Sequence, residues 1–188
     1  MIRPTTMNQR CLNARHNLVV QQLSVFANRL GASCLVEPSG LDIETGKRPD
    51  LLISLPHITL LVDVSICNPT APSHIRTAQK ALGTAIRREQ EKHRKYDQIA
   101  SSISARFVPF VMESYGGLGN EAVQMLSMLI PPDSSPLFSV LSRSKLPQEL
   151  RYSVAVSLQR GNALTLMVGL ARSRSLGARS ALRSRRLD

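Results

Sequence analysis

RPDLLISLPHITLLVDVSIC, residues 48–67, is the stretch of the sequence that decides the fold. It contains two short apolar runs, DLLISL at residues 50–55 and ITLLVDVSIC at residues 58–67, with Pro56 and His57 between them. Both runs are rich in β-branched and apolar side chains and are bounded by proline, which predicts two adjacent strands joined as a hairpin. The second run is apolar almost throughout, which is typical of a strand covered on both faces.

Helical periodicity and further short apolar runs define the elements around this hairpin. The predicted helices are residues 17–30, 73–102 and 120–130, and the further strands are residues 34–36 and 106–113. Gly31 lies just past the first helix, and Ser73 is placed to cap the second. Pro109 favours an edge position or a bulge for the last strand. The pattern predicts an α/β fold with helices around a sheet.

Composition divides the chain into four parts. These are a polar lead-in (residues 1–15), the core (residues 16–130), a helical extension (residues 131–171) and a basic tail (residues 172–188). We expect the tail, which has six arginines and one acidic residue, to be disordered. The extension begins with a linker at residues 131–136 and continues as a pair of helices, because Gly161 and Gly169 disfavour one continuous helix.

Composition and charge also restrict the function. The 188 residues include 24 Lys plus Arg and 13 Asp plus Glu, a formal net charge of +11, which favours DNA or RNA as the partner. Aromatic residues make up only 4%, which disfavours a single-strand binder built on stacked rings. The sequence has neither a membrane-length apolar run nor a secretory signal, so we expect no membrane partner. Three widely spaced cysteines without a zinc pattern indicate an intracellular protein, nuclear or cytoplasmic.

Two carboxylates occur where the hairpin should be apolar. Asp50 opens the first strand, and Asp63 lies in the middle of the second. A buried, unpaired carboxylate is costly, so Asp63 requires a cationic partner or a metal. An antiparallel hairpin can bring the two carboxylates together, and such a pair suits a hard divalent cation such as Mg²⁺. In the alternative interpretation, Asp50 is a turn residue and Asp63 pairs with a nearby Lys or Arg.

Basic residues on the predicted helix 73–102 lie within reach of these carboxylates. Lys92 and Lys95 are three residues apart and share one helix face, and Tyr96 belongs to the apolar face. A lysine at the border with the core can orient an attacking water or stabilise charge on a phosphate. A solvated basic helix, or a helix facing DNA, would have the same pattern.

The blocks RPDLLISL, LLVDVSICNP, EKHRKY and FVPFVMESYGGLG, in this order, resemble the restriction-endonuclease-like domain of the PD-(D/E)XK superfamily. The likeness is closest to the domain found downstream of the reverse transcriptase in retrotransposon polyproteins, and it covers residues 15–130. It implies a mixed β-sheet flanked by helices. It also implies an endonuclease that nicks duplex DNA with Mg²⁺, for which Mn²⁺ can substitute.

The resemblance assigns Asp50 and Asp63 to metal binding. Glu37 is either an added carboxylate ligand or a surface residue before a turn. The superfamily usually has a lysine two residues after the second acidic residue, but this position is Ser65 here.

The retrotransposon branch has its lysines in a K-x-x-K-Y block on the following helix, which matches Lys92, Lys95 and Tyr96. Either lysine can therefore be the catalytic one. The residues expected to contact nucleic acid are Arg48, Arg88, Arg94 and Tyr96.

Two other classes of function stay open. Ser65 at the usual lysine position favours a degenerate nuclease fold that binds DNA or RNA without cutting it. A protein-interaction domain or a homodimer is a third and weaker hypothesis, which rests on the apolar stretches at residues 137–140 and 154–168.

Overall fold

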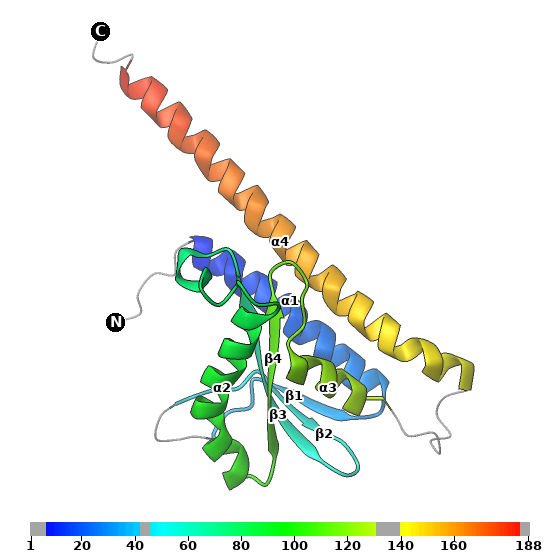
Figure 1. Ribbon diagram of the computed structural model, residues 1–188. Coiled ribbons are helices and arrows are strands. Elements are labelled where there is room, and N and C mark those ends of the chain that lie inside the picture. Colours follow the sequence, from blue (N-terminus) through cyan, green and yellow to red (C-terminus); the bar gives the residue numbers. More distant parts are fainter. Residues whose placement is uncertain (1–6, 42–45, 131–139, 185–188) are drawn as a thin grey trace.

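The chain folds around a four-stranded mixed sheet (Figure 1). The computed structural model describes residues 7–41, 46–130 and 140–184, with side chains described for residues 13–41, 46–130 and 145–174. The elements in chain order are α1 (Met7–Arg29), β1 (Ser33–Val36), β2 (Leu51–Ser54), β3 (Thr59–Cys67), the 3₁₀ turn η1 (Pro72–His74), α2 (Gly83–Ser102), β4 (Arg106–Glu113), α3 (Asn120–Met128) and α4 (Val140–Ser184).

The sheet confirms the predicted hairpin and the mixed topology. Its strand order is β1-β2-β3-β4, with the first two pairs antiparallel and β3 parallel to β4. Leu51 of β2 faces Val62 of β3, and Asp63 is in register with Pro109 of β4. β4 is an edge strand, as Pro109 predicted, because a proline there costs no ladder hydrogen bond on the open side.

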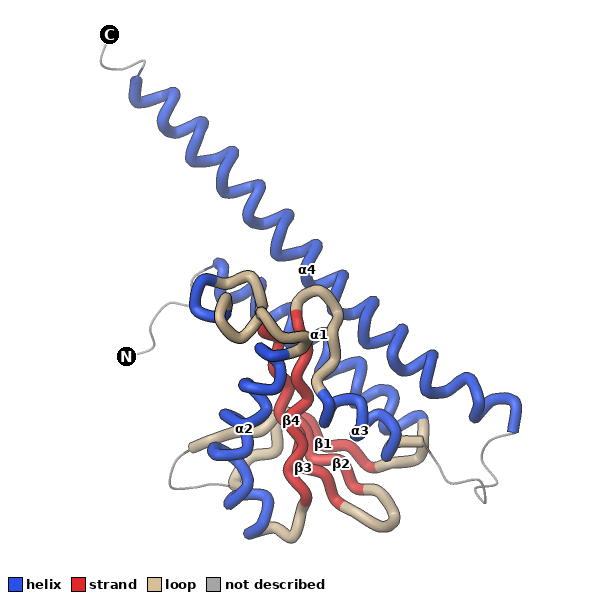
Figure 2. Tube along the Cα trace, in the orientation of Figure 1, coloured by secondary structure: helices blue, strands red, loops and turns tan. Residues whose placement is uncertain are grey.

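Helices cover both faces of the sheet (Figure 2). β3 is buried along most of its length, and its side chains alternate between the two faces. Val62 and Val64 join the main core with α1, α3 and α4, whereas Leu61 packs with Tyr96 of α2 and Phe107 of β4. The carboxylate of Asp63, two residues after Leu61, therefore lies on the α2 face.

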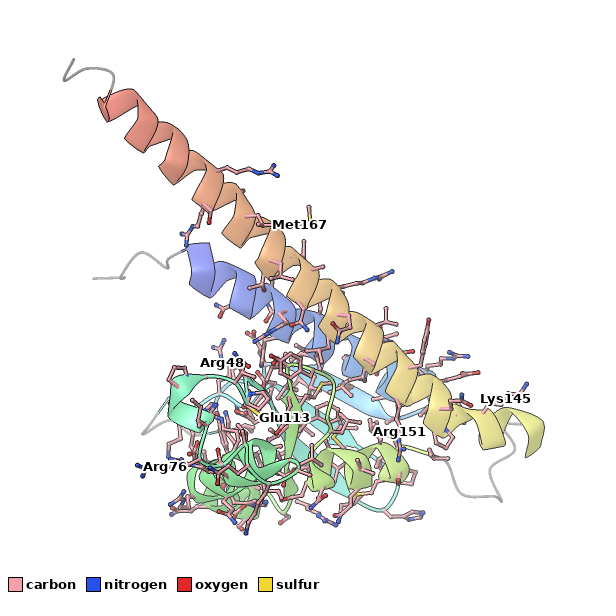
Figure 3. All side chains as sticks on the ribbon, turned by 45° about the horizontal axis from the view of Figure 1, so that its top comes forward. Arg48, Arg76, Glu113, Lys145, Arg151 and Met167 are labelled. Atoms are coloured by element: carbon pink, nitrogen blue, oxygen red, sulfur yellow. The ribbon has the colours of Figure 1, made fainter. Side chains whose placement is uncertain are left out.

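The C-terminal extension is one long helix, α4, and the expectation of two helices is wrong. α4 lies antiparallel to α1 (Figure 1) and buries apolar side chains at four-residue spacing, namely Leu146, Leu150, Val154 and Leu158. Gly161 marks the closest approach of the two helices, because a Cβ there would lie 2.5 Å from Cγ of Arg15. This glycine therefore serves helix packing and does not end the helix. Figure 3 places Met167 on the outer part of α4, where its side chain is exposed.

Three element boundaries differ from the sequence expectations. α1 begins at Met7, so most of the expected lead-in is helical, and its packing partner α4 is too distant in sequence to leave a local pattern. α2 begins at Gly83 instead of residue 73, since Leu82 has a left-handed φ of 56° and residues 72–82 form turns. α4 continues to Ser184, through most of the tail expected to be disordered. The expected linker at residues 131–136 lies outside the described residues.

Among the helices described, none combines the length and the apolar character that crossing a bilayer requires.

Candidate functional site

Asp50 and Asp63 are brought together by the β2–β3 hairpin. The register pairs Leu51 with Val62, and one step further the backbone N–H of Asp50 donates to the carbonyl of Val62 at 3.0 Å. Residues 50 and 63 thus face each other across the ladder. Asp63 is only 4% exposed, so its charge requires compensation inside the protein.

Lys92 of α2 supplies that compensation. Its Nζ lies 2.5 Å from Oδ2 of Asp63, and both side chains are buried. Lys95 lies on the exposed side of the same turn, where its Nζ donates to the hydroxyl of Tyr96 at 2.8 Å. Partial burial and the neighbouring Lys92 hold the pKa of Lys95 below its usual value. The sequence did not distinguish Lys92 from Lys95, and in the fold it is Lys92 that pairs with the carboxylate of Asp63.

His16 of α1 makes the corresponding contact with Asp50. Oδ2 of Asp50 accepts the backbone N–H of Val64 at 2.6 Å and lies 3.2 Å from Nε2 of His16. Burial lowers the pKa of His16, but the hydrogen bond and the charge of Asp50 outweigh it and raise that pKa to about 8. At neutral pH the imidazole is therefore mostly protonated and donates to the carboxylate.

Sequence reasoning did not find His16 as a site residue. Its only sequence signal is the Arg15-His16-Asn17 tripeptide one turn before the buried stripe of α1, and no local spacing connects it with Asp50. The contact joins residues 34 positions apart, so only the packing of α1 on the sheet shows it.

Tyr96 is not placed to contact nucleic acid, and this expectation is wrong. Its residue is 1% exposed, and its ring packs against Phe107 with centroids 5.2 Å apart. Its hydroxyl donates to the backbone carbonyl of Arg48 at 3.3 Å. Burial and the charge of Asp63 raise the pKa of Tyr96, so the phenol stays neutral and tethers α2 to the start of β2.

Glu37 and Arg48 form an exposed ion pair at the rim, with Nη1 of Arg48 3.3 Å from Oε2 of Glu37. The backbone N–H of Glu37 donates to the carbonyl of Asp50 at 2.8 Å, and both residues line a cavity of about 470 Å³ that His16 also lines. Glu37 has a left-handed φ of 48°, a sparsely populated conformation for a non-glycine residue. Its carboxylate is therefore close to Asp50 but engaged with an arginine.

A second cavity of about 490 Å³, the cationic cavity, adjoins the carboxylates between α1, the end of β3 and the first turns of α2. Its basic lining residues are Arg15, His16, Arg87, Arg88 and Lys92, and His74 also lines it. Glu91 is the acidic residue that lines it, and it is already paired with Arg87 at 3.2 Å and with Arg88 at 2.9 Å. Arg94 does not line this cavity and donates to the carbonyl of Gln90 instead. The cavity therefore carries an excess of positive charge next to the carboxylates.

Two carboxylates are the oxygen donors that the site offers to a metal. The described residues contain no cluster of three or more His, Cys, Asp or Glu side chains able to hold an ion. Mg²⁺ is commonly held by only one or two carboxylates and completes its octahedral shell with water and substrate phosphate. The donor set of Asp50 and Asp63 is compatible with that mode of binding, provided that Lys92 shares the Asp63 carboxylate.

Comparison with known proteins relates the chain to a retrotransposable element. No family model matches the chain. The chain is similar to the "Retrotransposable element SLACS 132 kDa protein" of Trypanosoma brucei gambiense, with 30% identity over 125 residues. The match covers 61% of this chain and 10% of that protein, so the chain spans about a tenth of its relative's length. The chain is therefore a distant homologue of a retrotransposable-element protein.

Proposed function

We propose that this chain is a Mg²⁺-dependent DNA endonuclease domain that nicks duplex DNA. The observation that carries the proposal is the pair of facing carboxylates, Asp50 and Asp63, with a buried lysine 2.5 Å from the second and a cationic cavity beside them. Carboxylates are ligands for the Mg²⁺ that assists phosphodiester hydrolysis, and a lysine ammonium beside them can stabilise charge on the phosphate. The distant relation to a retrotransposable-element protein supports the proposal only through the need of such elements to insert into DNA.

Each residue of the site has a distinct part in this proposal. Asp50 and Asp63 would hold the metal, which would stabilise charge on the scissile phosphate and lower the pKa of a bound water. Lys92 stands beside Asp63, where its ammonium can neutralise a phosphate oxygen or orient the attacking water. The N–H of Val64 and the imidazole of His16 fix the orientation of Asp50.

Residues around the two carboxylates would add a further metal ligand and attract the DNA backbone. Glu37 lines the same cavity as Asp50 and would serve as an added ligand once its pairing with Arg48 is broken. Mn²⁺ can take the place of Mg²⁺ because it accepts the same oxygen ligands. Arg48, Arg88 and Arg94 are exposed and contribute to the positive surface that attracts the DNA backbone.

A plasmid-nicking assay with Mg²⁺, Mn²⁺ or EDTA tests the proposal. Asp63→Asn should abolish metal-dependent nicking while DNA binding is retained, because the amide removes a metal ligand and a negative charge. Asp97→Asn is the matched control, since Asp97 is exposed on α2 and pairs with His93 outside the site. Equal nicking by the wild type and Asp63→Asn would contradict the proposal.

A binding module without cleavage is the second candidate function, and one observation favours it. Each carboxylate already has a cationic partner within the fold, His16 for Asp50 and Lys92 for Asp63. Such pairs neutralise the two carboxylates without a metal. In addition, Ser65 occupies the position where the superfamily that the chain resembles usually has a lysine. Salt-sensitive binding of DNA without nicking under any metal condition would establish this alternative.

A further inference from the structure

We infer that Arg15, held in the cationic cavity by α4, is a ligand for a phosphate of the DNA backbone. The inference rests on the proposed function in taking DNA as the ligand, but it does not require cleavage. It makes the α1–α4 helix pair part of the nucleic-acid interface, in addition to the sheet and α2.

The first observation is that the charge of Arg15 is uncompensated. Among the described residues, no carboxylate forms an ion pair with it, and its buried Nε has no hydrogen-bond partner. Burial holds the pKa of Arg15 below its usual value. The nearby Cys67 does not offset this charge, because burial and Glu113 raise the pKa of the thiol to about 11 and keep it neutral.

A half-buried guanidinium without an anion is costly to a protein. Five N–H donors in a planar fork match the oxygens of a phosphate, and an arginine is the preferred residue for such recognition. An unsatisfied arginine in a cavity that already carries excess positive charge is therefore best explained by an anionic ligand. Because the cavity adjoins the proposed cleavage site, we expect this anion to be a DNA backbone phosphate next to the scissile one.

The second observation is that Arg15 is held in a fixed position. Its Nη1 donates to Oδ1 of Asn162 at 3.0 Å, and Nδ2 of Asn162 donates to the carbonyl of Ser114 at 2.8 Å. Gly161 lets the backbone of α4 approach the Cα of Arg15 closely, since a Cβ there would lie 2.7 Å away. This chain of contacts ties α4, α1 and the loop after β4 to one guanidinium. Such preorganisation lowers the entropic cost of binding a phosphate.

The test measures affinity for a labelled DNA duplex in EDTA, where no metal-dependent cleavage occurs. Titrations between about 50 and about 200 mM KCl give both the Kd and the slope of log K against log salt concentration. Arg15→Gln should weaken binding about tenfold at the lower salt concentration and reduce the slope by about 0.9, the loss of one phosphate contact. Arg29→Gln is the matched control, because Arg29 lies at the other end of α1, about 21 Å away along the helix axis.

Asn162→Ala provides a second variant that leaves every arginine in place. It should weaken binding with little change in slope, because the charge remains but its position is lost. A slope for Arg15→Gln equal to that of the wild type would overturn the inference, as would an equal loss in Arg29→Gln. If Arg15→Gln does not fold, wild-type affinity in Asn162→Ala would overturn it. Since cleavage is not measured, failure here is distinguishable from failure of the nicking assay.

Discussion

Helix α2 contributes side chains to two charged clusters, which differ in whether the charges around them are compensated within the fold. The site cluster is Asp50, Asp63, His16 and Lys92, of which His16 and Lys92 line the cationic cavity. The capping cluster is Glu89, His93, Asp97 and Glu121, between α2 and the start of α3.

In the capping cluster, the charged side chains find their hydrogen-bond and ion-pair partners within the fold. Oε1 of Glu89 accepts the backbone N–H of Glu121 at 3.1 Å, so a side chain of α2 caps the first turn of α3. His93 lies between two carboxylates, with Nε2 2.6 Å from Glu121 and Nδ1 2.7 Å from Asp97. Every partner in this cluster comes from the fold, so its charge serves to join two helices.

The site cluster differs in what surrounds it. Its two ion pairs border a cavity in which one of the lining arginines, Arg15, has no anionic partner among the described residues. If this position served stability alone, an acidic or neutral residue in place of Arg15 would stabilise the fold, because it would not add an uncompensated positive charge. The comparison therefore shows that the sign and pairing of the neighbouring groups, more than the presence of buried charge, separate a binding site from a structural cluster.

The largest expected effect separates Lys92 from Lys95. Lys92→Ala should lower cleavage at least roughly 100-fold, the scale seen for loss of one electrostatic group at a transition state. It should also destabilise the fold by about 3 kcal/mol, because Asp63 is left as an unpaired buried charge. Lys95→Ala should cleave and unfold like the wild type, since Lys95 is an exposed residue whose ammonium contacts Tyr96 and pairs with no carboxylate among the described residues.

Initial nicking rates and urea unfolding of both lysine variants check this prediction. Equal losses in Lys92→Ala and Lys95→Ala would show that the buried pair is not the functional one.

A stability effect without an effect on cleavage is expected at the capping cluster. Gly119→Ala should destabilise the fold by about 1–3 kcal/mol, because a Cβ there would collide with Oε1 of Glu89. Gly169→Ala is the control, since nothing lies within 4 Å of its Cβ position and alanine favours the helix. Urea unfolding and nicking below the unfolding midpoint measure the two effects. Loss of nicking in folded Gly119→Ala would join the two clusters into one functional unit.

The smallest expected effect is a pH dependence carried by His93. Burial lowers its pKa, but the hydrogen bonds to Asp97 and Glu121 outweigh this and raise it above 6.5. The folded state therefore binds the proton more tightly than the unfolded state. The resulting stabilisation is complete below pH 6.5 and is lost as the pH rises through the raised pKa.

His93→Gln should remove this pH-dependent part of the stability. The difference in Tm between the wild type and His93→Gln should be largest below pH 6.5 and should shrink as the pH rises through the raised pKa of His93. A difference that stays constant across the range would show that the imidazolium makes no net contribution.

The sequence predicted the elements that rest on local pattern. The β2–β3 hairpin, β1, β4 and α3 follow from β-branched runs, turns and helical spacing, and Pro109 correctly indicated an edge strand. The helix ends were less predictable, because the start of α2 depends on the left-handed Leu82 and the length of α4 on its packing against α1. The predicted contact of Tyr96 with nucleic acid is wrong because its ring is buried against Phe107 between α2 and β4, as its place on the apolar face of the helix had indicated.

By itself, the sequence predicted that a hairpin can bring the two carboxylates together and that one of two lysines on a shared helix face can reach them, because strand register and helix periodicity are local properties. Only the tertiary structure decided that Lys92 is that lysine, that His16 holds Asp50, and that Asn162 holds Arg15. These contacts join residues 29, 34 and 147 positions apart. They form when apolar faces of separate elements pack together, and no local periodicity records which polar side chains will then meet.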